Sequence, residues 1–314
     1  MSDVSGTHNS ADSGAVHPGT VVTPGNHDGV HLGHRALLAA ARELGAHVTA
    51  LTFDPHPAMV LAPSKAPPLL TTPARRAALL KKLGADAVEI LAFDEELAAM
   101  RPEEFVRRVI GERLHASGVV VGPDFRFGKG RAGDVDTLRA LGSERGFEVR
   151  TVGPVHLDGD VVSSTRIRKR VALGDVEGAT RLLGRVHDVG GTVVQGDQRG
   201  RTIGFPTANL DCESVLLPAD GVYAVVMRVG ETLHRGVANL GVRPTFAAGR
   251  SVEAHLFDFD ADIYGATARV GFVQRIRGEQ KFSGLDALKA QIALDADAAR
   301  AALDAADPSD WQLV

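Results

Sequence analysis

A glycine-rich segment near the amino terminus, PGNHDGVHLGHR (24–35), carries residue types that suit phosphate binding. His31 and His34 stand three residues apart, after an apolar run and at the start of a helix-like run. A zinc site needs three or four ligands, and neither an HExxH metal motif nor a GxSxG nucleophile motif occurs in the sequence. Glycines let the backbone approach a bulky anion, a helix amino terminus supplies free N–H groups, and imidazoles can donate hydrogen bonds to phosphoryl oxygens. The segment therefore favours phosphate binding, with a glycine turn bearing surface histidines as the plainer alternative.

A second segment, SSTRIR (163–168), offers three hydroxyl side chains and the guanidinium group of Arg166. These groups suit phosphate oxygens, because an arginine can bind two of them at once. The same residues also fit a Ser/Thr helix cap whose basic side chains face water, and the sequence leaves both interpretations open. The basic run RIRKR (166–170) is weak evidence for nucleic-acid binding in a chain of net charge −4.

In the carboxyl-terminal half, GRTIGFPTAN (200–209) combines glycines with two oxygen-bearing side chains. The Thr207 hydroxyl and the Asn209 amide oxygen are hard ligands suited to Mg²⁺, which prefers to be shared with phosphate oxygens. The Walker A pattern GxxxxGK[ST] is absent, and a PTAN turn without metal is the alternative. The glycines that could let this loop wrap a polyphosphate are Gly196, Gly200 and Gly204.

A carboxylate, Glu253, lies in the run VEAHLFDF (252–259), which alternates as a strand does. The alternation predicts Val252, Ala254 and Leu256 on one face, with Glu253, His255 and Phe257 on the other. A lone strand carboxylate is most often solvated surface. On chemistry alone, Asp258 and Asp260 are equal candidates for a general base.

The elements that must position these residues alternate between strand and helix up to about residue 184. Alternation of this kind predicts a parallel sheet with helices on both faces. The predicted strands lie at 19–25, 47–53, 87–93, 118–122 and 147–153. The predicted helices lie at 31–45, 73–84, 101–114 and 134–146.

After about Gly184 the pattern becomes a series of strands without intervening helices, followed by one helix at 285–306. This pattern predicts an antiparallel barrel or sandwich with a terminal helix. The predicted strands lie at 190–196, 221–229, 234–241, 251–260 and 268–277. We therefore divide the chain into a disordered tail (1–19), an α/β domain (20–184) and a β domain (185–314).

Composition limits the class of protein. The chain has 314 residues, of which 44% are hydrophobic, and a net charge of −4. It has a single cysteine, Cys212, so no intramolecular disulfide can form, and this fits a reducing cytosol. No apolar run approaches the roughly 20 residues that span a bilayer. The sequence predicts a cytoplasmic protein that binds small molecules and neither membrane nor nucleic acid, as a monomer or weak homo-oligomer.

Several long motifs then resemble one family. GNHDGVHLGH (25–34) looks like the GxFDxxHxGH signature of the HxGH nucleotidyltransferase superfamily. Together with LTFDPHP (51–57) and VGPDFRFGKGRAGD (121–134), it resembles the adenylyltransferase half of the prokaryotic bifunctional riboflavin kinase/FAD synthetase. GRTIGFPTANL (200–210) and VEAHLFDFDADIYG (252–265) resemble its kinase half. The resemblance implies a Rossmann-like nucleotidyltransferase domain, a riboflavin kinase barrel, and ATP, riboflavin and FMN as substrates with Mg²⁺.

The resemblance also implies roles for individual residues. Glu253 would be the base for the riboflavin 5′-hydroxyl, and Thr207 and Asn209 would hold Mg·ATP. The catalytic groups of the transferase would be His31, His34 and Arg166. The other ATP and phosphate contacts would be Gly25, Asn26, Asp28, Gly33, Ser163, Ser164, Thr165, Gly196, Gly200 and Gly204. The flavin contacts of the transferase would be Asp124, Phe125 and Phe127, although at least one of these rings also suits a core position.

The sequence departs from the family pattern at three places. His27 replaces a Phe, Pro123 replaces an acidic residue, and Arg185-Val186-His187 replaces Arg-Pro-aromatic. We expect His27 to add a pH dependence to the transferase that His27→Phe would flatten. Two alternatives follow: a riboflavin kinase whose transferase domain is impaired or altered, and a non-catalytic flavin- or nucleotide-binding regulator.

Overall fold

The computed structural model describes residues 19–196, 204–242 and 250–313, and the chain divides into two compact units. The sheet unit is built from residues up to Asn26, Ala36–Ser64 and Leu80–Gly153. The barrel unit is built from His27–Arg35, Lys65–Leu79 and the chain from Pro154 onward. The predicted tail at 1–19 lies outside the described residues except for Gly19, and its disorder stays a prediction.

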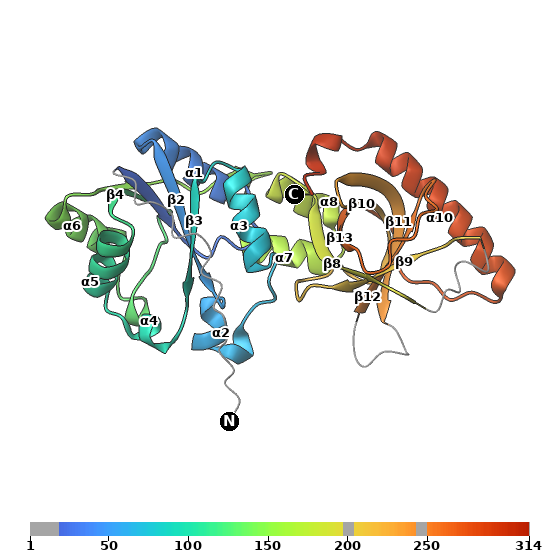
Figure 1. The fold of residues 1–314 in the computed structure, drawn as a ribbon, viewed down its shortest axis with the longest axis horizontal. Coiled ribbons are helices and arrows are strands. Elements are labelled where there is room, and N and C mark those ends of the chain that lie inside the picture. Colours follow the sequence, from blue (N-terminus) through green and yellow to red (C-terminus); the bar gives the residue numbers. More distant parts are fainter. Residues whose placement is uncertain (1–18, 197–203, 243–249, 314) are drawn as a thin grey trace, which may run out of the picture. The chain divides into compact units, whose positions relative to one another are not determined.

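The sheet unit contains five parallel strands in the order β3-β2-β1-β4-β5 (Figure 1). They are β1 (Thr20–Pro24), β2 (His47–Asp54), β3 (Ala87–Ala92), β4 (Ala116–Val121) and β5 (Glu148–Thr151). The central strand β1 is buried along its whole length, as expected for a strand covered on both faces. The predicted parallel sheet is confirmed.

Helices connect these strands, and two of them, α1 and α3, have residues in both units. The α-helices are α1 (Leu32–Leu44), α2 (Pro57–Leu61), α3 (Pro73–Lys82), α4 (Glu95–Ala99), α5 (Pro102–Phe105) and α6 (Val135–Arg145). Other helical segments are η1 (Pro63–Lys65), the π-helical η2 (Val106–Arg113) and η3 (Lys129–Arg131). The single helix predicted at 101–114 is therefore wrong in detail, because its second half winds as a π-helix.

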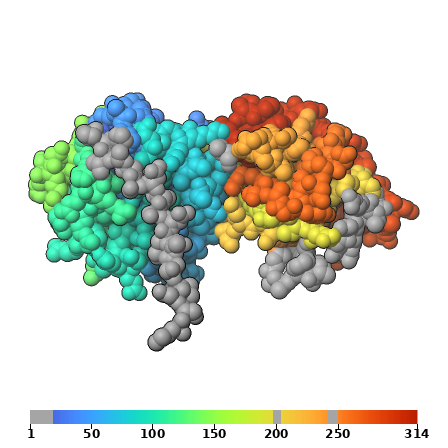
Figure 2. All heavy atoms as spheres, in the orientation of Figure 1, coloured from blue at the N-terminus to red at the C-terminus, as the bar shows by residue number. Residues whose placement is uncertain are grey.

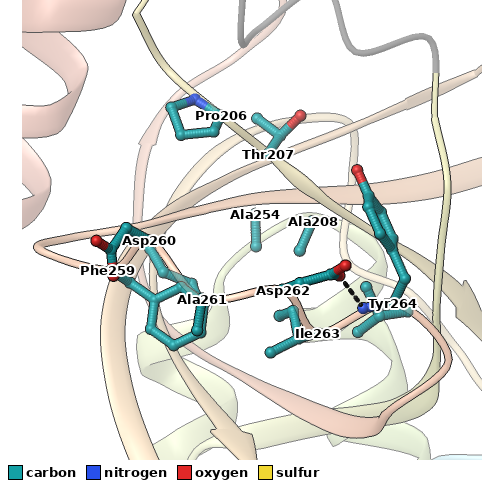
Figure 3. Close-up of a pocket in the computed structure, with 12 residues that line it drawn as sticks. Pro206, Thr207, Ala208, Ala254, Phe259, Asp260, Ala261, Asp262, Ile263 and Tyr264 are labelled. Atoms are coloured by element: carbon teal, nitrogen blue, oxygen red, sulfur yellow. Dashed lines mark hydrogen bonds between the residues drawn. The ribbon is translucent and has the colours of Figure 1, made fainter.

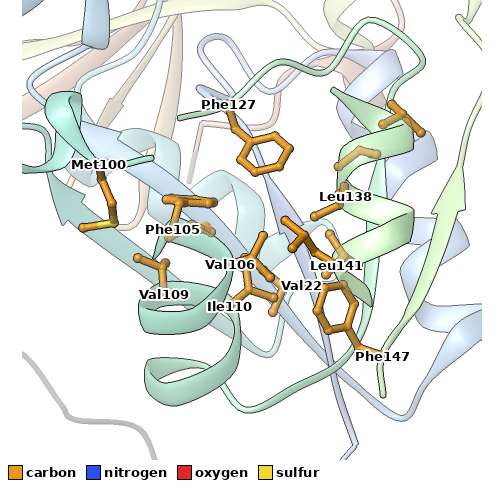
Figure 4. Packing of buried hydrophobic residues seen from close by; sticks show 14 of the residues in the cluster. Val22, Met100, Phe105, Val106, Val109, Ile110, Phe127, Leu138, Leu141 and Phe147 are labelled. Atoms are coloured by element: carbon orange, nitrogen blue, oxygen red, sulfur yellow. The ribbon is translucent and has the colours of Figure 1, made fainter. Parts of the chain in front are cut away.

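Alternate residues of the sheet pack on opposite faces. Val22 and Val119 are paired in register and join a core with α5, η2 and α6, whose side chains include Phe105, Ile110 and Leu138 (Figure 4). On the other face, Leu44 of α1 lies over Gly118, where a Cβ atom would come within 2.8 Å of its Cδ2. Helices thus cover both faces, as the strand–helix alternation predicts.

The barrel unit contains a closed antiparallel barrel with the strand order β10-β11-β12-β9-β8-β13 (Figure 1). The strands are β8 (His187–Val194), β9 (Ala208–Cys212), β10 (Gly221–Val229), β11 (Thr232–Val242), β12 (Arg250–Leu256) and β13 (Thr267–Arg277). The barrel alternative is confirmed. The sequence pattern did not predict β9, which begins at Ala208, directly after Thr207. It also predicted that β12 ends at residue 260, whereas the strand ends at Leu256.

The terminal helix α10 (Leu285–Ala305) packs on the outside of the barrel (Figure 2). On β10, Tyr223, Val225 and Met227 fill the barrel interior. The alternate residues Val222 and Ala224 pack in the cluster that includes α10. Burial on both faces explains why β10 is a continuous apolar run.

The chain between sheet and barrel forms a hairpin, β6 (His156–Leu157) and β7 (Asp160–Val161), and two helices, α7 (Ser164–Ala172) and α8 (Val176–Leu183). A short segment η4 (Pro308–Asp310) follows α10. Within the described ranges, no helix is long and apolar enough to cross a membrane.

A buried carboxylate, Asp188 of β8, collects three guanidinium groups of the barrel unit. Arg75 donates to it through Nε at 2.9 Å and Nη2 at 2.5 Å, and Arg269 of β13 donates through Nη1 at 2.8 Å. Arg185 Nε lies 4.0 Å from the same carboxylate. Burial alone would raise the pKa of Asp188, but the charges of Arg75 and Arg185 hold that pKa below its usual value.

We expect Asp188→Asn to lower the free energy of unfolding by about 3–5 kcal/mol, because it leaves buried guanidinium groups without a counter-charge. Chemical denaturation, monitored by the fluorescence of Trp311, measures the change in the free energy of unfolding. The matched control is Asp304→Asn, which breaks an exposed pair with Arg235 and should cost less than about 1 kcal/mol. Equal losses in the two variants would contradict the prediction.

Candidate active sites

The loop that follows β1 takes an unusual backbone path before α1 begins. His27, Gly29 and Val30 have φ values of 48°, 83° and 41°. A β-branched residue such as Val30 is strained in this left-handed region, so contacts elsewhere must hold the loop. In the sheet unit, Gly25 N donates to Leu51 O and Thr52 Oγ1 donates to the backbone oxygen of Asn26. These bonds fix Gly25 and Asn26 at the carboxyl end of β1.

The rings of His31 and His34 are stacked, with centroids 3.7 Å apart. Gly33 N donates to His31 Nδ1 at 3.1 Å, and His31 N donates to His34 Nδ1 at 3.2 Å. An Nδ1 that accepts a hydrogen bond leaves the proton of the neutral ring on Nε2. Both imidazoles are therefore set as Nε2–H donors.

Burial, followed by the charges of His27 and Arg185, lowers the pKa of His31 from 6.5 to about 4. Burial also holds the pKa of His34 well below its usual range, with a smaller effect from His31. Burial therefore favours the neutral form of both rings. His27 is 1% exposed and packs edge-on against His34, and the pH dependence expected of residue 27 stays a prediction.

The glycine of the HLGH motif has a steric reason. A Cβ atom on Gly33 would lie 3.0 Å from His31 Cε1 and 3.1 Å from its Nδ1. The His31 ring thus lies directly over residue 33, and a larger residue would displace it.

Asp28 ties this loop to the rest of the barrel unit. Its carboxylate accepts hydrogen bonds from the backbone N atoms of Leu70 and Thr71 and from Arg168 Nη2, the last at 2.6 Å. Its backbone oxygen accepts from Ser164 Oγ at 2.8 Å. The loop and the first turn of α7 are therefore neighbours. The engagement of the Asp28 carboxylate favours a positioning role over a direct contact with phosphate.

The SSTRIR segment forms the amino terminus of α7. Ser163 caps the helix by accepting from Arg166 N, which is the alternative that the sequence left open. Thr165 is exposed. Arg166 Nη2 lies 2.6 Å from the Asp160 carboxylate, and its Nη1 is buried without a hydrogen-bond partner among the described residues. An unused donor beside a helix amino terminus suits an anion.

The proposed flavin contacts of the sheet unit divide by burial. Phe127 is 7% exposed and packs in the core against Phe105. Phe125 is partly buried and stacks on Phe127 at 5.5 Å, whereas Asp124 is exposed. The core position predicted for at least one ring belongs to Phe127, and its burial is against a flavin contact. Contacts at Asp124 and Phe125 stay predictions.

A second set of polar residues lies in one row across the barrel. Asn209 of β9 pairs in register with Glu253 of β12, which pairs with Asn239 of β11. Opposed residues of antiparallel strands have Cβ atoms roughly 4.5–5.5 Å apart. The predicted alternation is confirmed for Val252 and Ala254, which are buried in the barrel interior. The sequence offered no signal for Asn239.

Thr207 lines two cavities, and the larger one also contains Glu253 and Asn239 of this row. One, of about 400 Å³, lies between Pro206–Ala208 and the segment Phe259–Tyr264 (Figure 3). The other, of about 770 Å³, contains Glu253 and is bounded by α10 through Leu288 and Ile292. The rival carboxylates lie elsewhere: Asp260 lines the first cavity, and Asp258 pairs with Arg300. Thr207 also lines the cavity of Asp260, so what distinguishes Glu253 is its pairing in register with Asn209.

The PTAN turn is positioned by its neighbours. His255 Nδ1 lies 2.8 Å from the backbone oxygen of Pro206. A Cβ atom on Gly196 would fall 2.1 Å from Asn209 Nδ2, so glycine is needed for this close approach. Asn209 Oδ1 is buried without a hydrogen-bond partner among the described residues. Gly204 has a φ of 89°, and Gly200 lies outside the described residues.

No group of three His, Cys, Asp or Glu within the described ranges could hold a metal ion. A Thr–Asn pair with one unused oxygen instead suits Mg²⁺ that is shared with phosphate. The loop of residues 25–34, which we call the histidine loop, lies beside a helix amino terminus. The barrel carries a carboxylate beside the Thr–Asn pair. Together with the parallel sheet, these features define a transferase that acts on phosphate groups at two places.

Comparison with known proteins identifies the family. The sequence models of FAD synthetase and of riboflavin kinase match residues 14–166 and 183–303. The bifunctional riboflavin kinase/FMN adenylyltransferase of Escherichia coli (strain K12) is 41% identical over 306 residues, which cover 96% of this chain and 97% of that one. The protein of the same name from Pseudomonas fluorescens is 42% identical over 307 residues, covering 96% and 97%. The chain belongs to the bifunctional riboflavin kinase/FMN adenylyltransferase family.

A solved structure is similar in fold over most of the chain. A crystal structure described as a macrolide-efflux protein from Streptococcus pneumoniae has a TM-score of 0.83 and 33% identity, and covers 90% of this chain and 94% of its own.

The packing of His31 over Gly33 predicts the titration of a Gly33→Ala variant. Displacing the ring toward solvent should raise the pKa of His31 from about 4 toward 6.5, as NMR of the histidine rings can measure. The unfolded chain binds a proton on His31 near pH 6.5, whereas the folded ring binds it only near pH 4. The free energy of unfolding therefore falls as the pH drops from 6.5, and this fall should be smaller in the variant. The control is Gly153→Ala, where a Cβ atom meets nothing within 4 Å. An unchanged His31 titration in Gly33→Ala would contradict the prediction.

Proposed function

We propose that the chain phosphorylates riboflavin to FMN with ATP and then adenylylates FMN to FAD with a second ATP, releasing pyrophosphate. The observation that carries the proposal is the strand register that sets Glu253 opposite Asn209. Glu253 lines the larger of two cavities, and Thr207 lines both of them. The histidine loop with its two Nε2–H donors supports the second reaction. Both activities are those of the family.

For the kinase, we propose that riboflavin occupies the larger cavity and ATP the smaller one. The larger cavity has apolar walls that suit an isoalloxazine ring, including Val222, Val237 and Phe282, and it contains Glu253. Thr207, at the boundary, lies where the two substrates would meet. Glu253 accepts the proton of the 5′-hydroxyl while that oxygen bonds to the γ-phosphorus, and the bond to the leaving ADP oxygen breaks.

The residues present fit a magnesium ion. Thr207 and Asn209 would hold it, since Asn209 Oδ1 has no other partner among the described residues. When bound, the ion supplies neutralisation of charge on the ATP phosphates. His255, through Pro206, and Gly196 keep the two ligand side chains in place.

For the adenylyltransferase, an FMN phosphate oxygen attacks the α-phosphorus of ATP, and the bond to pyrophosphate breaks. His31 and His34 would donate from Nε2 to the phosphoryl oxygens as charge grows on them, and the unused Nη1 of Arg166 would add a third donor. Ser164 and Asp28 act on the position of the loop. No covalent enzyme intermediate is needed, since positioning and electrostatics suffice.

Further assignments belong to the same proposal. The adenylyltransferase comprises residues 20–184 and the kinase 185–314, each with its own active site. The protein works in the cytoplasm as a monomer or weak homo-oligomer. The direct test of both activities is riboflavin with Mg·ATP and purified protein, resolving FMN from FAD over time. FMN as the sole product would reject the second activity, and no turnover would reject both.

We expect Glu253→Gln to abolish FMN formation from riboflavin while FAD formation from supplied FMN continues, because the base belongs to the kinase site alone. Loss of one general base typically costs 10²–10⁴-fold in rate. Asp258→Asn is the matched control, since its carboxylate pairs with Arg300, and it should retain both activities. Retained kinase activity in Glu253→Gln would remove it from the role of base.

Metal dependence tests the ligand pair. Thr207→Ala and Asn209→Ala should each depress the kinase and raise the Mg²⁺ concentration needed for half-maximal rate, because each removes one oxygen ligand. Adenylyl transfer to supplied FMN should keep its own Mg²⁺ dependence. Wild-type Mg²⁺ titrations of the kinase in both variants would rule the assignment out.

A further inference from the structure

The backbone of the histidine loop is held by a side chain at the start of the kinase half. Arg185 Nη2 donates to the backbone oxygen of Gly29 at 2.8 Å, and Nη1 donates to that of Val30 at 3.1 Å. These are the two residues before His31, and both have positive φ. A single guanidinium group therefore braces the strained part of the loop at two adjacent carbonyls.

Arg185 is itself held by the barrel. Its side chain is 4% exposed, and its Nε lies 4.0 Å from the Asp188 carboxylate of β8. Asp188 is fixed in turn by Arg75 and by Arg269 of β13, which also lies 3.4 Å from Glu213. The loop is thus connected to two barrel strands through buried charges, all within the barrel unit.

We infer that Arg185 is a positioning residue of the adenylyltransferase reaction. It sets the distance between the histidine Nε2–H donors and the reacting phosphate by fixing the carbonyls of Gly29 and Val30. The inference rests on the proposed function of the loop. A residue at the start of the kinase half thereby affects the active site of the adenylyltransferase.

Three guanidinium groups around one carboxylate make the inference testable without unfolding the protein. In Arg185→Met, Asp188 keeps Arg75 and Arg269, so no carboxylate is left unpaired and one excess buried positive charge is removed. The matched control is Arg269→Met, which removes a different guanidinium from Asp188 and does not touch the loop. Arg185→Lys keeps the charge but cannot bridge two carbonyls as the planar fork does.

The experiment uses the full chain and measures kcat and KM for FAD formation from FMN, together with FMN formation from riboflavin. We expect Arg185→Met to lower the kcat of FAD formation by about 100-fold, with the KM for ATP changed by less than about threefold. Arg185→Lys should recover part of the loss. Arg269→Met should stay within about threefold of wild type, and the riboflavin kinase rate should hold in all three.

Two outcomes would overturn the inference. One is wild-type kcat for FAD formation in Arg185→Met. The other is an equal loss of kcat for FAD formation in Arg185→Met and Arg269→Met that parallels the loss of thermal stability in each variant. This result would make the role of Arg185 merely structural. If wild type itself forms no FAD from FMN, the proposed function fails, and this result is distinct from both.

Discussion

The structure depends on one buried interaction, the Asp188 carboxylate with the guanidinium groups of Arg75, Arg185 and Arg269. Charges removed from water must be paired with good geometry, or the fold is penalised by several kcal/mol. This requirement brings together residues more than 100 positions apart in the sequence. It joins strands β8 and β13, and Arg185, whose Nε lies 4.0 Å from the same carboxylate, donates two hydrogen bonds to the backbone of the histidine loop.

Arg185 of this arrangement also contributes to the electrostatics of that loop, after burial and the neighbouring histidines. Burial, reinforced by neighbouring positive charge, lowers the pKa of His31 and of His34, which favours neutral rings over cations. A neutral donor preset on Nε2 needs no reorganisation when charge develops on a phosphoryl oxygen. In the barrel, strand register places Glu253 and Asn209 opposite each other.

Periodicity and motif predicted much of this from the sequence. The parallel sheet, the barrel and the interior positions of Val252 and Ala254 follow from local alternation, which the fold preserves. The π-helical turn of η2 and the short strand β9 did not follow, because neither leaves a distinct local period. Asn239 and Asp188 could not be found either, since their importance comes from partners that only strand register and tertiary packing supply. Ser163 caps α7 and Phe127 packs in the core, which are structural roles that their residue types also allow.

The most direct test of this account is amide hydrogen exchange of the full chain in wild type and Arg185→Met. Loop amides such as Gly29 N and Gly33 N make hydrogen bonds that depend on the braced backbone. We predict that amides of residues 27–35 exchange at least about tenfold faster in the variant, while those of β10 keep their protection. Unchanged protection of the loop, or equal loss of protection in loop and barrel, would contradict the claim that Arg185 holds the loop from the barrel.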